Sequence, residues 1–186
     1  MRVVFVGPPG CGKGTQAALL EKRLGLAYIG TGDMLRESVA QGTEVGYKAK
    51  AYIDAGQLVP DAVVNELVAE RLGRPDSPTD FLLDGYPRNA SQARTLDALL
   101  HDRGLPLQAV ILFRIDDEVV VQRMLARQRA DDTEETARLR VKVFRDSARE
   151  LVAYYRKQKL VREIDASQPV EHVYLRIACL LLPKDS

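Results

Sequence analysis

The sequence predicts an α/β fold with three layers, in which helices cover both faces of a parallel sheet. Short apolar runs recur along the 186 residues, and each run is continuous rather than alternating, as in parallel strands that are buried on both faces. Between these runs, apolar residues fall three and four positions apart, which is the spacing of a helix with one buried face. We therefore expect strands and helices to alternate around one core.

The expected elements follow in chain order. Strands are predicted at residues 3–6, 81–83, 110–113 and 161–164. Helices are predicted at residues 16–24, 61–72, 91–100, about 118–127 and about 133–155, with a last helix after Pro169, which suits a first helical turn. Residues 73–78 have the composition of a loop, and no repeat, low-complexity tract or linker divides the chain. We expect one domain spanning residues 1–186.

Composition and charge argue against several classes of function. Charged residues make up 28% of the chain and the net charge is +1, so no global field attracts nucleic acid or an acidic membrane. Cys11 and Cys179 lie far apart without a CxxC companion, which indicates neither a metal site nor a disulfide framework. No signal peptide or membrane span is recognisable. The simplest expectation is a reducing, cytoplasmic compartment.

A phosphate-binding loop is expected directly after the first strand. Residues 7–15 read GPPGCGKGT and lie between a strand and a helix, the context that a Walker A motif requires. Its glycines let backbone N–H groups face a polyphosphate, the helix N-terminus adds its dipole, and Lys13 adds a point charge. A glycine-rich turn without a ligand is the simpler alternative, but the lysine at this spacing favours nucleotide binding. The ATP-binding candidates here are Gly10, Cys11, Gly12, Lys13, Gly14 and Thr15.

Two positions of this loop need separate comment. Gly14 follows the lysine, where the general motif has Ser or Thr, and the hydroxyl comes one residue later at Thr15, so direct ligation of Mg²⁺ by the threonine is not expected. Cys11 is interpreted as a small side chain that fills a loop position, rather than as a reactive thiolate, and we assign it no chemistry.

Three further segments carry motifs. They are TGDMLR at residues 31–36, DGYPR at 84–88 with Gln92 beyond it, and the arginine-rich stretch 123–140. In order and spacing these segments resemble the adenylate kinase family, across nearly the whole chain. The resemblance implies a P-loop kinase domain with a central five-stranded parallel sheet, a helical AMP-binding flap at residues 30–59 and a short lid at 128–138.

The resemblance also implies the acceptor site. Thr31 would lie near the adenine of AMP, Arg36 and Arg88 would hold its phosphate, and Gln92 would bond the adenine edge. A helix cap followed by a solvated arginine, and an ordinary turn after a strand, are the simpler readings of these two motifs. The implied AMP-binding residues are Thr31, Arg36, Gln57, Leu58, Val59, Gly85, Tyr86, Pro87, Arg88, Gln92, Arg129 and Arg140.

On the donor side, the resemblance assigns Arg123 to packing over the ATP adenine, Arg127 to the ATP phosphates, and Gln168 to a loop that touches the base. Arginines on amphipathic helices are usually solvated and paired with acids, and this alternative is strongest for Arg138. Only Gln128 separates two arginines where long-lid members carry an insertion. The chain therefore resembles the short-lid subclass, and no lid zinc site is expected.

The implied activity is the reversible transfer of the γ-phosphoryl group of Mg-ATP to AMP, which gives two ADP and serves adenine nucleotide homeostasis. Asp84 would hold waters of the Mg²⁺ shell rather than abstract a proton, so no residue is a direct metal ligand. ATP, AMP and ADP are the expected partners of a monomer, without nucleic acid or membrane. The expected catalytic residues are Lys13, Asp84, Arg88, Arg127, Arg129 and Arg140.

Two alternatives remain open. A UMP/CMP kinase shares these motifs, although pyrimidine kinases tend to carry Asn at the position of Gln92, and Thr31 also favours adenine. A switch or sensor module that binds ATP without an acceptor would leave Arg36, Arg88 and Gln92 unexplained. An RNA-binding interpretation of the arginine-rich stretch is disfavoured by its interleaved acids.

Overall fold

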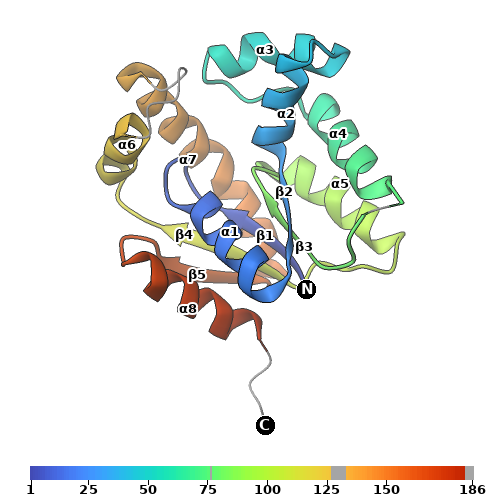
Figure 1. The fold of residues 1–186 in the computed structure, drawn as a ribbon, viewed down its shortest axis with the longest axis vertical. Coiled ribbons are helices and arrows are strands. Elements are labelled where there is room, and N and C mark those ends of the chain that lie inside the picture. The colour runs from blue at the N-terminus through green and yellow to red at the C-terminus, as the bar shows by residue number, and fades with distance from the viewer. Residues whose placement is uncertain (76, 127–132, 183–186) are drawn as a thin grey trace.

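The protein is built on a five-stranded sheet in which every pairing is parallel (Figure 1). The computed structural model describes residues 1–75, 77–126 and 133–182. The strand order is β2-β3-β1-β4-β5. The strands are β1 (Arg2–Val6), β2 (Ala27–Gly30), β3 (Phe81–Asp84), β4 (Ala109–Arg114) and β5 (Val161–Asp165).

Helices connect successive strands and form the two outer layers. Two of them, α2 (Thr31–Ala40) and α3 (Glu44–Asp54), stand beyond the end of the sheet and lead into the next connecting helix (Figure 1). The others are α1 (Lys13–Leu24), α4 (Asp61–Gly73), α5 (Ala90–His101), α6 (Asp117–Ala126), α7 (Glu134–Lys157) and α8 (Val170–Leu181).

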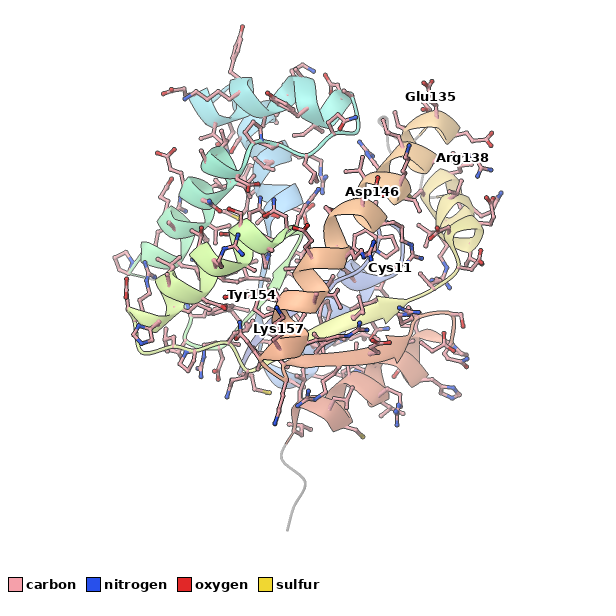
Figure 2. All side chains as sticks on the ribbon, turned by 180° about the vertical axis from the view of Figure 1, so that it is seen from behind. Cys11, Glu135, Arg138, Asp146, Tyr154 and Lys157 are labelled. Atoms are coloured by element: carbon pink, nitrogen blue, oxygen red, sulfur yellow. The ribbon has the colours of Figure 1, made fainter. Side chains whose placement is uncertain are left out.

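The core has two halves because successive strand residues face opposite sides of the sheet. In β1, Val4 and Val6 join the cluster formed with α4, α5 and the second half of α7, whereas Val3 and Phe5 join the cluster formed with α1, α6 and α8. Figure 1 faces the α1 and α8 side, and Figure 2 faces the α5 and α7 side. Full burial of both faces explains the continuous apolar runs in the sequence.

The connections leave the central strands in opposite directions. From β1 the chain passes through α1, on one face, to β2 at one edge; from β3 it passes through α5, on the other face, to β4. Crevices at such a switch point, beyond the carboxyl ends of the strands, are where open α/β sheets bind ligands. Phe5 of β1 pairs in register with Asp84 of β3, so both strands deliver their following loops to this place.

The predicted five-stranded parallel α/β fold is confirmed, and all four strands and six helices located from the sequence are present within a few residues. The strand β2 was not located, since its four residues include a glycine and lie at a half-exposed edge. Helix α1 begins at Lys13 rather than residue 16. Within the described residues no helix is long and apolar enough to cross a membrane.

Candidate active site

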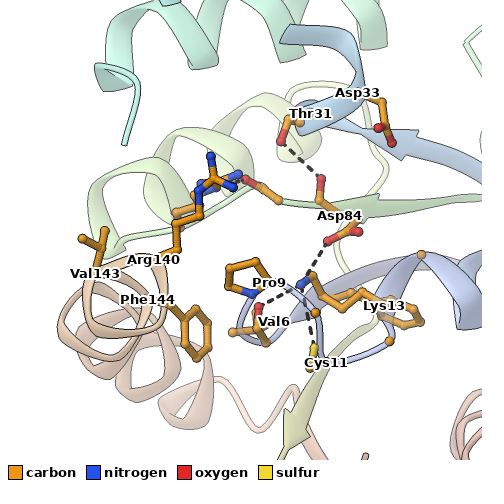
Figure 3. A pocket seen from close by; sticks show the side chains of 18 of the residues that line it. Val6, Pro9, Cys11, Lys13, Thr31, Asp33, Asp84, Arg140, Val143 and Phe144 are labelled. Atoms are coloured by element: carbon orange, nitrogen blue, oxygen red, sulfur yellow. Dashed lines mark hydrogen bonds and ion pairs between the residues drawn. The ribbon is translucent and has the colours of Figure 1, made fainter. Parts of the chain in front are cut away.

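A cavity of about 810 Å³ opens at the carboxyl ends of β1 and β3 (Figure 3). Its walls come from the β1–α1 loop, α2, the loops after α3 and β3, α7, and the segment between β5 and α8. The residues predicted for the site that line it are Gly10, Cys11, Gly12, Lys13, Gly14, Thr15, Thr31, Arg36, Gln57, Leu58, Val59, Asp84, Gly85, Pro87, Arg88, Gln92, Arg123, Arg140 and Gln168. Arg127 and Arg129 lie outside the described residues.

The β1–α1 loop has the conformation of a phosphate cradle. Gly10 and Gly12 adopt φ angles of 87° and 102°, a region that favours glycine. A Cβ atom at Gly12 or Gly14 would meet nothing within 4 Å, so the backbone at both positions borders open space. Helix α1 starts at Lys13 and therefore adds its N-terminal N–H groups and dipole to the same place.

The Lys13 side chain is hydrogen-bonded to backbone carbonyls of its own loop. Its Nζ atom donates to the carbonyl oxygens of Gly7 at 2.9 Å and Pro8 at 3.1 Å, and lies 3.8 Å from Oδ1 of Asp84 (Figure 3). Both charged side chains are largely buried, which strengthens their attraction. A polyphosphate in the cradle would offer the ammonium a stronger partner than these carbonyls.

Cys11 packs beneath the loop. Only 2% of the residue is exposed, and a Cβ atom at Gly7 would lie 2.7 Å from its Sγ atom. Burial raises the pKa of the thiol, and the nearby charge of Lys13 offsets this only in part. The side chain is therefore a neutral packing group, as the sequence suggested.

Three arginines from separate elements gather at the other end of the cavity. Arg36 of α2 donates to Oδ1 of Asp33 at 2.5 Å, Nε of Arg88 donates to the Gly85 carbonyl at 2.7 Å, and Arg140 of α7 donates to the Ile53 carbonyl at 3.1 Å. Arg36 and Arg140 therefore come from two different helices that both line the cavity.

The charges of these arginines act on one another. The protein around Arg88 lowers its pKa although the side chain is exposed to the cavity, and the charges of Arg36 and Arg140 lower it further, against the opposing effect of Asp84. The two like charges beside Arg88 favour binding of an anion here, in a chain whose net charge is only +1. A phosphate group bound here would relieve that repulsion.

The buried polar residues Thr31 and Gln92 support the loop that carries Arg88. The Thr31 hydroxyl donates to the Asp84 carbonyl at 3.2 Å. The Gln92 side chain accepts from the Arg88 backbone N–H at 2.7 Å and donates to Oδ1 of Asp61 at 2.8 Å. Asp61 was not among the predicted site residues, because an acid in a first helical turn carries no distinguishing signal. Gln92 thus fixes the backbone of Arg88 through this hydrogen bond.

Among the described residues predicted for the acceptor end, Tyr86 is the one that does not line the cavity. It is buried, and its hydroxyl donates to Oδ1 of Asn65 at 2.7 Å. The loop 57–59 follows α3, and its first N–H is already bonded to the Tyr52 carbonyl at 2.8 Å. Tyr86 is therefore a supporting residue of the site.

Sequence comparison places this geometry in a family. A family model described as "Adenylate kinase" matches residues 5–160. The chain belongs to the adenylate kinase family. Proteins named adenylate kinase are 47% identical over 181 residues in Rhodococcus erythropolis, covering 97% of this chain and 99% of the relative, and 48% identical over 180 residues in Thermobifida fusca, covering 95% of each. A third, from Mycobacteroides abscessus, is 48% identical over 176 residues, which is 95% of this chain and 96% of the relative.

Membership of the adenylate kinase family makes the chain a phosphotransferase and connects the cradle with the arginine cluster. A kinase of nucleoside monophosphates must hold two phosphate-bearing molecules end to end. The cradle around Lys13 and the cluster of Arg36, Arg88 and Arg140 are two groups of positive charge that line one cavity. Asp84 lies between them, 3.8 Å from the lysine and electrostatically coupled to Arg88.

The residues that the resemblance assigned to the donor base line the cavity at the segment between β5 and α8. Arg123 donates to the Ala166 carbonyl at 3.2 Å, and Nε2 of Gln168 donates to Oδ2 of Asp165 at 2.8 Å. Gln16 was missed by the sequence analysis: it lines the cavity, is 3% exposed, and donates from Nε2 to the Val170 carbonyl at 2.9 Å. Its position just after the phosphate loop was the available signal.

Magnesium would fit this site through the nucleotide rather than through a protein cage. Over the described ranges, no group of three His, Cys, Asp or Glu side chains is arranged to hold a metal ion. The carboxylate of Asp84 borders the cavity beside the cradle, and Mg²⁺ characteristically keeps several waters while binding phosphates and one or two carboxylates. The donor set therefore suits a hydrated Mg²⁺ carried by a polyphosphate.

Proposed function

We propose that this chain transfers the γ-phosphoryl group of magnesium-bound ATP to AMP, giving two ADP. The observation that carries the proposal is the pair of anion sites in one cavity, the glycine-rich cradle with Lys13 and the converging guanidinium groups of Arg36, Arg88 and Arg140. A sensor that binds only ATP needs the first site and has no use for the second. A kinase needs both.

Positioning and charge neutralisation are the two tasks of the protein in this reaction, since phosphoryl transfer needs little covalent help. The cradle and Lys13 hold the ATP phosphates, while Arg36 and Arg88 hold the AMP phosphate. Arg140 reaches both groups from α7 and neutralises charge on the oxygens between them. Each of these cations must exchange a partner within the protein for a phosphate oxygen.

Magnesium, when bound with ATP, supplies further charge neutralisation on the phosphate oxygens. Asp84 would hold waters of that ion rather than take a proton from AMP. The carboxylate is oriented for this role by its neighbours, since it ends the buried strand β3 and faces Lys13.

Several assignments extend the proposal beyond the described contacts. Residues 30–59 are assigned to the AMP-binding flap, and of the short lid expected at 128–138 only residues 133–138 lie within the described part of the chain. Arg127 and Arg129 contact the phosphates, and Thr31 and Gln92 contribute to adenine selection. The proposal includes a cytoplasmic monomer. The family membership and the placement of α2 and α3 beside the cavity support this arrangement.

A ³¹P NMR time course of the purified protein with Mg-ATP and AMP, CMP, UMP or no acceptor tests the reaction and its substrate together. ADP formation only with AMP is the expected result. Transfer to CMP or UMP would move the assignment to a pyrimidine kinase, and phosphate release without an acceptor, or no reaction, would favour an ATPase or a sensor.

The Arg88→Ala variant tests the acceptor site within the same experiment. Loss of a guanidinium that holds phosphate is expected to lower turnover on the order of 10²-fold or more. Arg94→Ala is the matched control, because Arg94 lies on the exposed side of α5 and does not line the cavity. Near-normal activity of Arg88→Ala would contradict the proposed acceptor site.

A further inference from the structure

A tyrosine that none of the motifs includes lies at the phosphate end of the cavity. The hydroxyl of Tyr28, on β2, donates to Oδ2 of Asp33 at 3.0 Å and lies 3.5 Å from Oδ2 of Asp84. Tyr28 also lines the cavity. Figure 3 shows the two aspartates at the same end of the site, one from the first turn of α2 and one from the end of β3. The tyrosine hydroxyl therefore connects two elements through their carboxylates.

The backbone of β2 explains how the ring reaches this position. Side chains two residues apart on a strand lie on the same face, so Tyr28 points to the side on which residue 30 would carry its own side chain. Residue 30 is glycine, and a Cβ atom there would lie 2.3 Å from the Tyr28 hydroxyl oxygen and 2.6 Å from the ring carbon that bears it. Gly30 thus leaves the space that the ring occupies.

The two oxygens of Asp84 have different partners. Oδ2 faces the Tyr28 hydroxyl, whereas Oδ1 faces the ammonium of Lys13 at 3.8 Å. A carboxylate bonded on one oxygen cannot rotate freely, so its second oxygen keeps a constant direction. Burial raises the pKa of the Tyr28 hydroxyl, and the charges of Asp84 and Asp33 raise it further, so the group stays a donor at neutral pH.

We propose that Tyr28 is a positioning residue, whose single hydroxyl proton is shared between Oδ2 of Asp33 and Oδ2 of Asp84 and thereby keeps Oδ1 of Asp84, the oxygen beside Lys13, directed toward the metal-bearing phosphates. This inference rests on the proposed transfer from Mg-ATP. The hydroxyl touches neither substrate nor metal; it acts through the carboxylate.

The Tyr28→Phe variant removes the hydroxyl and keeps the ring. The affinity of the enzyme–ATP complex for Mn²⁺, followed by the electron paramagnetic resonance signal of free Mn²⁺, is expected to fall about tenfold, the effect of losing one hydrogen bond to a charged group. kcat should fall by a similar factor, while KM for AMP changes less than about twofold, because the arginines that hold the AMP phosphate are untouched. Tyr154→Phe is the control, since its hydroxyl also donates to a carboxylate, Oδ2 of Asp97 at 2.8 Å, but it does not line the cavity.

A second pair of variants tests whether Gly30 acts by leaving space for the Tyr28 ring. Gly30→Ala should reproduce the losses of Tyr28→Phe, because its methyl group displaces the ring, and its backbone at φ −97° accepts alanine without strain. In a Tyr28→Ala background the same change should add nothing, since the ring that it displaces is gone. Additive losses would show that Gly30 acts independently of the tyrosine.

The outcomes separate the two proposals. If the unmodified protein forms no ADP from Mg-ATP and AMP, the proposed function fails whatever the variants do. If the unmodified protein is active and Tyr28→Phe matches it in Mn²⁺ affinity and kcat, the function stands and the positioning role is overturned. The positioning role would also be overturned if Tyr28→Phe lowered both activity and thermal stability but left the Mn²⁺ affinity unchanged. Tyr28 would then contribute to folding alone.

Discussion

Each cation of the phosphate loop and of the arginine cluster is bonded to an oxygen atom of the protein itself. The Lys13 side chain donates hydrogen bonds to the carbonyls of Gly7 and Pro8. Arg88 donates to the carbonyl of Gly85, and Arg140 donates to the carbonyl of Ile53. These contacts keep the long side chains in few rotamers, so less conformational entropy is lost when a phosphate replaces the carbonyl. Preorganisation of this kind belongs to individual residues and can be tested by replacing them singly.

Replacement of Lys13 by alanine is expected to lower kcat on the order of 10²- to 10³-fold, because one preorganised cation at the transferring phosphates is lost. The fold should persist, since the lysine contributes little to the core. Arg138→Ala is the matched control: its guanidinium pairs with Glu118 of α6 and Glu134 on the exposed start of α7 (Figure 2). Its activity should stay within about twofold of normal. Steady-state kinetics and circular dichroism on both variants would check this.

The two cysteines should differ in reactivity. The Cys11 thiol is buried and burial raises its pKa, whereas Cys179 is exposed on α8. Because the thiolate is the reacting form, alkylation by iodoacetamide near neutral pH should modify Cys179 at least about tenfold faster than Cys11. Mass spectrometry of the time course would measure both rates. Comparable rates would mean that the phosphate loop opens far more often than its packing suggests.

At the scale of elements, the approach of α2 to α3 controls the wall of the cavity that carries Arg36. Gly46 in the first turn of α3 allows this approach, because a Cβ atom there would lie 2.1 Å from the Ser38 carbonyl oxygen and 2.6 Å from the Val39 nitrogen. Both atoms are backbone, so the clash cannot be relieved by a rotamer change. The helix pair must separate if residue 46 gains a side chain.

Gly46→Ala is therefore expected to destabilise the protein by about 1–3 kcal/mol, the cost of overpacking at a close contact. Gly73→Ala is the matched control in another helix, since its new Cβ atom would meet only the end of the Arg103 side chain, at 3.4 Å. The control should be neutral or slightly stabilising, because alanine favours a helix. Thermal unfolding of both variants, at about 2–4 °C for each kcal/mol, would measure the difference. Equal midpoints would contradict the close packing.

Across the whole molecule, opposite charges are balanced by pairing on the surface. Glu44 with Lys48, Glu118 with Arg138 and Glu171 with Arg23 are bonded pairs, and the bonded cation lowers the pKa of each glutamate. Hydrogen bonds from Ser167 and Gln168 lower the pKa of Asp165 in the same way. The pairs are exposed and individually weak. For each of these carboxylates, the contribution to stability decreases as the pH falls.

Stability is expected to fall together with pH on the acid side. A carboxylate whose pKa is lower in the folded state stabilises the fold above its unfolded pKa, about 4.3 for glutamate, and that contribution is lost as pH falls through the folded value. The thermal midpoint should therefore be nearly constant from about pH 7 to 5 and decline below about pH 4.5. A Glu171→Gln variant should show a shallower decline. A midpoint that rose on acidification would contradict this assignment.

The sequence by itself determined the architecture and identified many of the residues that line the cavity. Continuous apolar runs required strands buried on both faces, and helical spacing between them required parallel connections, which was sufficient for the α/β fold. The phosphate loop and the motifs at residues 31–36 and 84–88 have fixed internal spacing. Local backbone geometry therefore carries their residues to the same end of the sheet. Patterns of this kind can be recognised in the sequence because each depends on residues that are close together in the chain.

Only the tertiary structure decided which residues act through others. Asp61 beneath Gln92, Gln16 beside Val170, and Tyr28 between Asp33 and Asp84 are contacts across different elements. The edge strand β2, too short and too exposed to show a period, has a defined place only because β3 pairs with it. Such relations depend on distances between segments that no local pattern encodes, since they are set by how helices and strands pack around the core.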